Sequence, residues 1–312
     1  MQVLGDLEEL EAACGGGVAM TIGVFDAVHR GHQMLMGRAR DEGQRRGLKS
    51  LVFTFERHPL SVLAPVHCPP AMTQPAQKVR LIEEQGVDLC LMLRFTAEIA
   101  ATEPETFVRE ILAQKCRARF IVCGEDFSFG AGGGGKVELL RERAEEFGYE
   151  IEVCDSMMQG ASPISSTRLR SDLIDGHLGE VEDLLGRRYG IEAEVVTGDG
   201  RGRELGFPTA NLKAAEDQLI PADGVYAVIV RAGGAAHGGM LNIGSRPTFE
   251  GAGRAIEVHL FDFEAELTGT RIEMEFIARV RDERKFDGVE KLIEQLKRDE
   301  QTCRELCGEA MG

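Results

Sequence analysis

The segment Thr21–Gln33, TIGVFDAVHRGHQ, decides the fold of the first half of the chain. Its apolar start predicts a strand that ends near Asp26, and a helix is expected to open near its last residue. Between strand and helix, His29 and His32 flank Gly31, which allows a ligand to approach the backbone closely. Unpaired N–H groups and partial positive charge suit a helix N-terminus to phosphate oxygens. A bare HxxH pattern is also compatible with a helix cap or a metal site.

Strands and helices alternate on both sides of this segment. The β-rich runs are VAMTIGVF, SLVFTF, VDLCLMLRF, RFIVCG and YEIEVCD, and polar amphipathic stretches separate them. This alternation is typical of βαβ units around a parallel sheet. A last helical stretch, Thr167–Leu185, is expected to close a first α/β domain over residues 1–186.

The second half has a different pattern, in which strands are separated by Gly-rich and Pro-containing turns. Its runs are IEAEVVTG, GVYAVIVRAGG, GGMLNIG, AIEVHLFDF and TRIEMEFIARV. Such a series indicates an antiparallel barrel or sandwich. The helical spacing over Gly288–Cys307 predicts a C-terminal helix packed on it. Residues 187–312 are therefore expected to form a second, β domain.

Composition narrows the class of partner. The chain has 312 residues, 43% of them hydrophobic, which is enough for two domains with separate cores. A formal charge of -16 and a pI near 5.0 argue against broad binding to nucleic acid or membranes. Its apolar runs are too short to span a bilayer, and its eight cysteines, without a CxxC pair, are expected to be reduced. We therefore expect a cytoplasmic protein that binds small molecules.

Four ordered motifs carry a family resemblance. HRGH at residues 29–32 matches the HxGH motif of the nucleotidyltransferase superfamily, and the whole run resembles the bacterial bifunctional riboflavin kinase and FAD synthetase family. TFERHP at Thr54–Pro59, GEDFSFG at Gly124–Gly130 and ISSTRLR at Ile164–Arg170 follow in the family's order. With the motifs of the second half, the resemblance covers about residues 18–300.

The resemblance implies an N-terminal Rossmann-like nucleotidyltransferase domain that joins AMP from ATP to FMN and releases pyrophosphate. It assigns contacts with ATP to His29, His32, Gly23, Phe25, Asp26 and Gly31, the two histidines being catalytic. It assigns the β and γ phosphates to Ser165, Ser166, Thr167 and Arg170. Hydroxyls and a guanidinium at a helix start suit phosphates, although such hydroxyls also fit an ordinary N-cap.

The flavin of this reaction is expected near GEDFSFG. Phe127 or Phe129 is placed to stack on the isoalloxazine ring, and Asp126 takes a position that is Asn in some relatives. Two alternating phenylalanines at a strand end are equally compatible with a core. Two departures concern this domain: Ala27 replaces the usual Gly of FDGVH, and Arg57 replaces a common Pro of TFxPHP.

A second chemical segment, Gly198–Leu212, is GDGRGRELGFPTANL and resembles the riboflavin kinase motif. Its glycines, Gly202 among them, allow main-chain N–H groups to surround a phosphate, and Arg203 adds charge. Thr209 and Asn211 supply hard oxygen ligands for Mg²⁺. A hairpin and an Asx or Ser/Thr turn are the structural alternatives.

Further residues of the kinase domain follow from the same resemblance. Glu257 lies in AIEVHLFDF, where Glu257, His259, Phe261 and Phe263 are expected on one face of a strand. The family assigns the base that deprotonates the riboflavin hydroxyl to Glu257, with a solvated or ion-paired carboxylate as the alternative. His259 is expected to be structural. NIGSRPTF at 242–249, Arg281 and Phe286 are expected to shape the flavin and nucleotide pockets, and Thr268 stands where relatives often carry Tyr.

The sequence thus predicts a bifunctional enzyme that converts riboflavin to FMN and FMN to FAD, with ATP as co-substrate and Mg²⁺. Flavoproteins are possible recipients of the products. Three alternatives remain open: a riboflavin kinase with an impaired adenylyltransferase domain, a flavin or nucleotide sensor without chemistry, and a nucleotidyltransferase for another acceptor.

Overall fold

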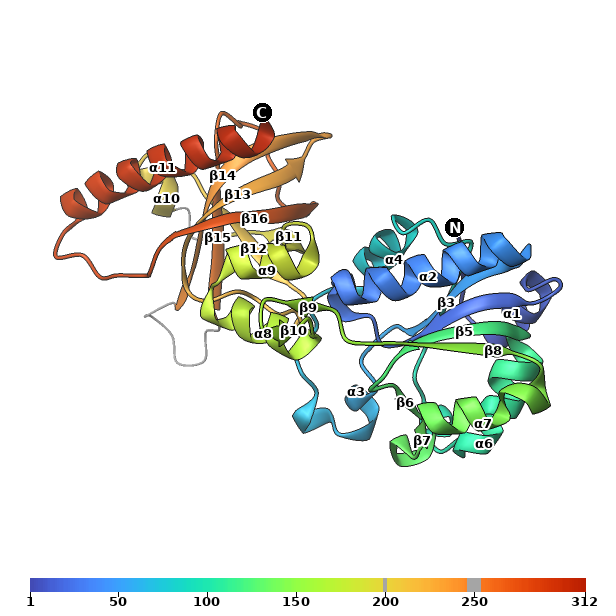
Figure 1. The fold of residues 1–312 in the computed structure, drawn as a ribbon. Helices are drawn as coiled ribbons and strands as arrows, with labels where there is room; N and C mark the ends of the chain where they lie inside the picture. Colours follow the sequence, from blue (N-terminus) through green and yellow to red (C-terminus); the bar gives the residue numbers. More distant parts are fainter. Residues whose placement is uncertain (199–200, 246–253) are drawn as a thin grey trace. The chain divides into compact units, whose positions relative to one another are not determined.

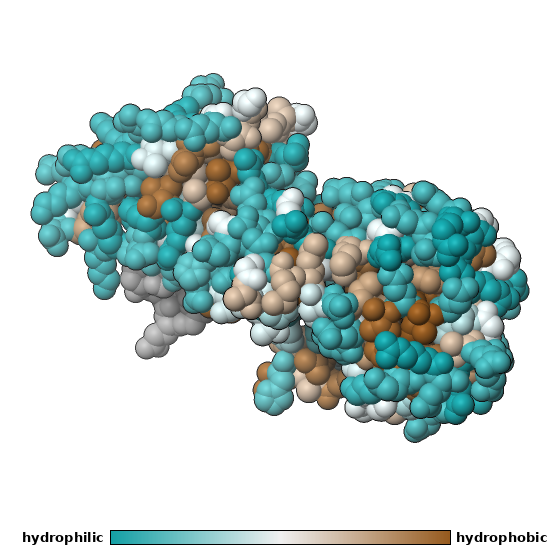
Figure 2. Space-filling model, in the orientation of Figure 1, coloured by the Kyte–Doolittle hydropathy of each residue, from teal (hydrophilic) through white to brown (hydrophobic). Residues whose placement is uncertain are grey.

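The computed structural model describes residues 1–198, 201–245 and 254–312 (Figure 1). Its contacts divide the chain into two compact units, Met1–Ser166 and Thr167–Gly312. Gly200 and residues 246–249 of the NIGSRPTF segment lie outside the described residues. Hydrophilic side chains cover most of the face seen in Figure 2, and apolar side chains form small separate patches on it.

The first unit is built on a six-stranded parallel sheet with the order β1-β4-β3-β2-β5-β8. Its strands are β1 (Gln2–Leu4), β2 (Val18–Ile22), β3 (Lys49–Phe55), β4 (Leu89–Leu93), β5 (Ala118–Gly124) and β8 (Glu150–Cys154). The four central strands are almost entirely buried because helices cover both faces. The α/β prediction is confirmed.

Helices α2 (Arg30–Arg46) and α4 (Pro75–Glu83) pack on one face of the sheet through an apolar cluster that includes Met36 and Ile82. On the other face lie α1 (Leu7–Ala13), a π-helix (Phe107–Lys115) and α7 (Val137–Phe147), joined by a larger cluster (Figure 1). The carboxyl ends of β2 and β3 therefore meet the start of α2 and the segment before α4.

The second unit is a closed antiparallel barrel with the order β11-β12-β15-β14-β13-β16. Its strands are β11 (Gly190–Val196), β12 (Ala210–Ala214), β13 (Gly224–Ala232), β14 (Ala235–Ser245), β15 (Arg254–Leu260) and β16 (Arg271–Arg281). Five of the six strands were expected. The exception, β12, begins directly after Pro208 and Thr209, where the sequence indicates a turn, and it is needed to close the barrel.

Helices complete the second unit. The long α11 (Val289–Met311) covers β13, β14 and β16 (Figure 1). Its own Cys303 and Cys307 are buried. The expected helical stretch before the barrel is divided into α8 (Ser166–Asp175) and α9 (Leu178–Leu185), because Gly176 adopts a left-handed φ of 79° between them. Over the described residues, no helix is sufficiently long and apolar to cross a membrane.

Candidate active sites

The first candidate site lies at the start of α2. His29 is the N-cap, and its Nδ1 accepts a hydrogen bond from the backbone N–H of His32 at 3.3 Å. The helix therefore begins at Arg30, three residues before the expected position, and His32 lies in its first turn. The expectation of a start near Gln33 was wrong because the His29 side chain caps the helix earlier.

The two imidazoles stack on each other, with ring centroids 3.5 Å apart and planes at 22°. His29 is buried and His32 partly buried, and the rings of Phe25 and His32 are nearly perpendicular, at 80°, with centroids 5.1 Å apart. Gly23 is required beside this group, since a Cβ there would lie 2.9 Å from the Phe25 ring. The start of α2, a helix of 17 residues, therefore brings two imidazoles together with the N–H groups of the first helical turn.

The backbone of the loop between β2 and α2 is strained. Three non-glycine residues have left-handed φ angles: Phe25 at 49°, Ala27 at 65° and Val28 at 44°. This conformation costs a residue with a Cβ about 1–2 kcal/mol. The observation gives a physical reason for the glycine that relatives carry at position 27, because glycine adopts the conformation without that cost.

Asp26, expected near the phosphates, points instead toward the segment that precedes α4. Its carboxylate accepts hydrogen bonds from the backbone N–H groups of Met72 and Thr73, each at 3.1 Å, and from the Thr73 hydroxyl at 3.1 Å. Thr73 Oγ1 also accepts from the N–H of Ala27 at 3.2 Å. Asp26 therefore anchors the loop, and a direct phosphate contact from it stays a prediction.

Lys78 is a residue of this region that sequence reasoning missed. It is 2% exposed, and its ammonium donates to the carbonyl oxygens of Val24 at 3.2 Å and Phe55 at 2.8 Å. Burial lowers the pKa of Lys78, and the negative charge of Asp26 opposes that effect. The available signal was a lysine on the buried face of α4, spaced with Leu81 and Ile82.

ISSTRLR opens a helix as expected, since α8 begins at Ser166. Ser165, Ser166 and Arg170 are partly buried, whereas Thr167 is exposed. Ser165 and Ser166 belong to the first compact unit, and Thr167 and Arg170 to the second. Their common action on one triphosphate stays a prediction from the family resemblance.

The two phenylalanines expected near the flavin differ in burial. Phe129 is 6% exposed and packs in the core against Phe107, with ring centroids 5.4 Å apart. Phe127 is partly buried and stacks on Phe129 at 5.5 Å, and Asp126 is exposed. Phe127 and Asp126 are thus available to a ligand, whereas Phe129 supports Phe127 from beneath.

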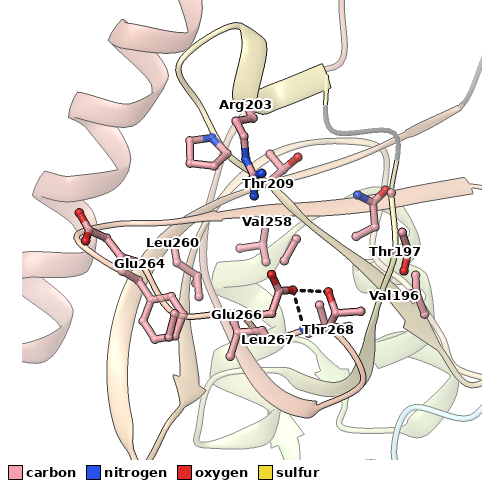
Figure 3. A pocket seen from close by; sticks show the side chains of 17 residues that line it. Val196, Thr197, Arg203, Thr209, Val258, Leu260, Glu264, Glu266, Leu267 and Thr268 are labelled. Carbon is pink, nitrogen blue, oxygen red and sulfur yellow. Dashed lines mark hydrogen bonds between the residues drawn. The ribbon is translucent and has the colours of Figure 1, made fainter.

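The second candidate site is a cavity of about 590 Å³ in the barrel unit. Figure 3 shows Arg203 and Thr209 on one side of it and Glu266 on the other. Val258 and Leu260 form an apolar wall between them. A cavity of this size with a cation and a few polar groups fits a nucleotide-sized ligand.

The glycines of the kinase motif allow a close backbone approach. A Cβ on Gly198 would lie 1.8 Å from Asn211 Nδ2, and one on Gly202 would lie 2.9 Å from Thr209 Oγ1. The backbone at positions 198 and 202 therefore packs directly on the two expected metal ligands. This contact requires residues without a side chain.

Glu257 lies on β15 directly opposite Asn211 of β12 and Asn242 of β14. Residues opposite each other in an antiparallel pair share a face, so a half-buried carboxylate stands between two amides. His259 is buried, and its Nδ1 lies 2.8 Å from the Pro208 carbonyl oxygen. This contact fits its expected structural role.

The expectation that Phe263 shares the face of Glu257 was wrong. β15 ends at Leu260, and Asp262 adopts a left-handed φ of 55° that turns the chain. Phe261 then packs in the cluster beneath α11, while Phe263 lines the cavity. The alternation could not continue because the strand ends before it.

The other expected pocket residues have partners within the barrel unit. Arg281 forms an ion pair of 2.7 Å with Asp299, which is 2% exposed. The Arg281 guanidinium lies 5.8 Å from the centroid of the Phe286 ring. Thr268 lines the cavity and donates a hydrogen bond to Glu266, which holds the pKa of that carboxyl below its usual value (Figure 3).

Comparisons with known proteins match almost the whole chain. Residues 12–168 match the family model of FAD synthetase, and residues 185–307 match that of riboflavin kinase. The bifunctional riboflavin kinase/FMN adenylyltransferase of Escherichia coli K12 is 38% identical over 309 residues, covering 99% of this chain and 98% of that protein. The Bacillus subtilis protein of the same name is 34% identical, with 90% of each chain covered.

A solved structure also matches closely. The crystal structure of a protein described as a macrolide-efflux protein, from Streptococcus pneumoniae, superposes with a TM-score of 0.86 at 31% identity, and covers 97% of this chain and 98% of its own. Both family models and the full-length relatives name the same two activities. The chain therefore belongs to the bifunctional riboflavin kinase/FMN adenylyltransferase family.

Proposed function

We propose that the two reactions of this family are carried out at separate places: phosphorylation of riboflavin at the barrel cavity, and adenylylation of FMN at the start of α2. The observation that carries this proposal is the contact of Gly198 and Gly202 with Asn211 and Thr209 at the cavity. A sensor that only binds flavin would not need two hard oxygen ligands at a cavity, one of which, Asn211, lies opposite the carboxylate of Glu257 on the neighbouring strand.

Mg²⁺ fits the residues at the cavity. Among the described residues, no three His, Cys, Asp or Glu side chains gather into a metal site. Mg²⁺ does not need such a cage, since it commonly takes one or two protein oxygens and completes its shell with water and phosphate. Thr209 and Asn211 would hold the ion, which would neutralise charge on the transferred phosphoryl group.

In the kinase reaction, Glu257 accepts the proton of the terminal ribityl hydroxyl of riboflavin. The hydroxyl oxygen then forms a bond to the γ phosphorus of ATP, and ADP leaves with the electrons of the broken P–O bond. Arg203 and the N–H groups around Gly202 hold the phosphates. Phe286 and Arg281 are proposed to contact the flavin.

In the second reaction, an FMN phosphate oxygen attacks the α phosphorus of ATP and pyrophosphate leaves. No covalent enzyme intermediate is required, so the protein aligns the reactants and neutralises charge. His29 and His32 bind the phosphates at the α2 N-terminus, and Ser165, Ser166, Thr167 and Arg170 hold the departing pyrophosphate. Phe127 and Asp126 are proposed to contact the flavin.

We place the enzyme in the cytoplasm, where flavoproteins would receive FMN and FAD. All eight cysteines are free thiols and six of them are buried. This state fits a reducing compartment.

The test is incubation of the purified protein with riboflavin, ATP and Mg²⁺, followed by separation of the flavins. We expect FMN and then FAD. The double variant His29→Ala with His32→Ala should stop FAD formation and spare FMN formation. Glu257→Gln should stop FMN formation and spare FAD formation from supplied FMN.

Matched controls are available in each unit. His67 is an exposed histidine of the first unit and Glu194 an exposed glutamate on β11, so His67→Ala and Glu194→Gln should leave both activities unchanged. If the unaltered protein makes FMN but no FAD, it is a riboflavin kinase without adenylyltransferase activity. The strained backbone at Ala27 favours this alternative. Loss of both activities in either site variant would contradict separate sites.

A further inference from the structure

The β2–α2 loop, residues 23–29, requires support from elsewhere in the unit. Phe25, Ala27 and Val28 all have left-handed φ angles, and such backbone persists only when the surrounding structure holds it. The loop ends at His29, whose side chain caps α2. Any relaxation of the loop would therefore move the helix cap and the stacked imidazole next to it.

One short segment, residues 72–78, supplies most of the support. Thr73 uses one hydroxyl for two contacts, donating to the Asp26 carboxylate at 3.1 Å and accepting from the Ala27 N–H at 3.2 Å. Asp26 and Thr73 are 6% and 4% exposed, so water does not compete for these bonds. Thr73 thus joins two consecutive residues of the strained loop.

Lys78 holds the other end of the loop. Its ammonium bridges the carbonyl oxygens of Val24, two residues beyond β2, and Phe55, the last residue of β3. The Thr54 hydroxyl donates to the same Val24 oxygen at 3.0 Å. A cation buried to this degree is unfavourable unless it is well paired. The burial of this charge therefore indicates that Lys78 does more than fill space in the core.

We propose that Thr73 and Lys78 are positioning residues for adenylyl transfer: they hold the β2–α2 loop in its strained form and so fix His29 and His32 where the ATP phosphates bind. Neither residue touches the substrate in this role. The inference rests on the proposed function of the two histidines, and it adds a second group of residues on which FAD formation depends.

The test compares Thr73→Val, Thr73→Ser and Lys78→Met in the full-length protein. Thr73→Val keeps the shape of the side chain and removes the hydroxyl, whereas Thr73→Ser retains the hydroxyl. We expect Thr73→Val and Lys78→Met to lower kcat/KM for ATP in FAD formation by roughly 10- to 100-fold, the effect of a misplacement of about 1 Å. KM for ATP should rise, KM for FMN should stay unchanged, and Thr73→Ser should restore activity.

The chain supplies its own controls for a merely structural effect. Ser50 is buried near the amino end of β3, and its hydroxyl donates a hydrogen bond to the Asp88 carboxylate at 2.7 Å. Ser50→Ala therefore removes a similar hydrogen bond, but at the amino ends of the strands rather than at their carboxyl ends. FMN formation measures the amount of intact enzyme in each sample. All rates are compared at temperatures where the circular dichroism of each variant matches that of the unaltered protein.

The outcomes separate this inference from the proposed function. FAD formation that is unchanged in Thr73→Val but lost in the double histidine variant would overturn the positioning role alone. An equal loss in Ser50→Ala, or no recovery in Thr73→Ser, would also overturn it. If the double histidine variant still makes FAD, the proposed site itself is wrong.

Discussion

At the scale of single residues, short sequence motifs point to candidate site residues, but they do not point to the residues that hold those side chains in place. His29, His32, Thr209 and Asn211 were assigned from short patterns, and the structure gathers each pair with its neighbouring glycines. Thr73 and Lys78 could not be assigned in this way. Their partners lie 23–54 residues away, and several of these are backbone atoms that leave no pattern in the sequence.

The backbone at Ala27 predicts an asymmetric response to substitution. Ala27→Val places a β-branched residue at a buried φ of 65°, which should destabilise the first unit by about 2–3 kcal/mol. Ala27→Gly relieves strain but adds entropy to the unfolded chain, so the net change should stay within about 1 kcal/mol. Heat inactivation of FAD formation, with FMN formation as reference, measures both. Equal inactivation of the two variants would contradict the inference that the backbone at Ala27 is strained.

The contact between Gly198 and Asn211 predicts a selective loss of kinase activity. Because a Cβ would lie 1.8 Å from Asn211 Nδ2, Gly198→Ala must displace that side chain. We expect FMN formation to fall by roughly 10- to 100-fold, as misplacement of a positioning group allows. Gly179→Ala is the control, since nothing lies within 4 Å of a Cβ there. FAD formation from supplied FMN should be unaffected in both.

At the scale of elements, periodicity predicts the parallel sheet, the barrel class and the last helix. It misses β12 because Pro208 and Thr209 read as a turn, although the chain enters a strand immediately after them. Pairing of β12 with β11 and β15 overrides this local signal. The end of β15 was misplaced for a similar reason, since nothing in the alternation marks the turn at Asp262.

The ion pairs of Glu42 on helix α2 should make the free energy of unfolding depend on pH in the acid range. Glu42 accepts hydrogen bonds from Arg45 and Arg46, which lower the pKa of its carboxyl to about 2 from an ordinary 4.5. Because the folded-state pKa is the lower one, this stabilisation is present above about pH 4.5 and is lost as the pH falls toward about 2. Ion pairs at a protein surface contribute about 0.2–1 kcal/mol.

Urea unfolding of the unaltered protein and of Glu42→Gln measures this effect. The unaltered protein should be the more stable at neutral pH, and the difference should shrink steadily below pH 4.5. Glu145→Gln, which replaces an exposed acid on α7, is the control. A difference that does not depend on pH would exclude the ion pairs as its cause.

At the scale of the whole molecule, the boundary between the two units falls within a short stretch of the sequence. The sequence predicts a boundary after residue 186, the contacts divide the chain after Ser166, and the family models leave residues 169–184 unmatched. Helices α8 and α9 fill that interval. Within the second unit, Leu173 accepts a hydrogen bond from Ala222, and α9 packs against β16.

These contacts predict that a barrel fragment needs both helices. Fragment 167–312 should unfold at a temperature roughly 10 °C or more above fragment 187–312, since each buried leucine contributes about 1.5–3 kcal/mol. Leu173, Leu178, Leu184 and Leu185 are all buried. Differential scanning calorimetry of the two fragments measures the difference. Equal midpoints would favour the boundary after residue 186.

The closure of the barrel by β12 also bears on the behaviour of the enzyme at high concentration. A closed barrel leaves no strand edge on which a second molecule could add a strand. The parallel sheet does have edges, but β1 is only three residues long, and on β8 Glu150 and Glu152 pair with Arg46 and Arg38. Short or charged edges resist strand addition, so the six-stranded sheet and the barrel are both protected against aggregation by strand pairing.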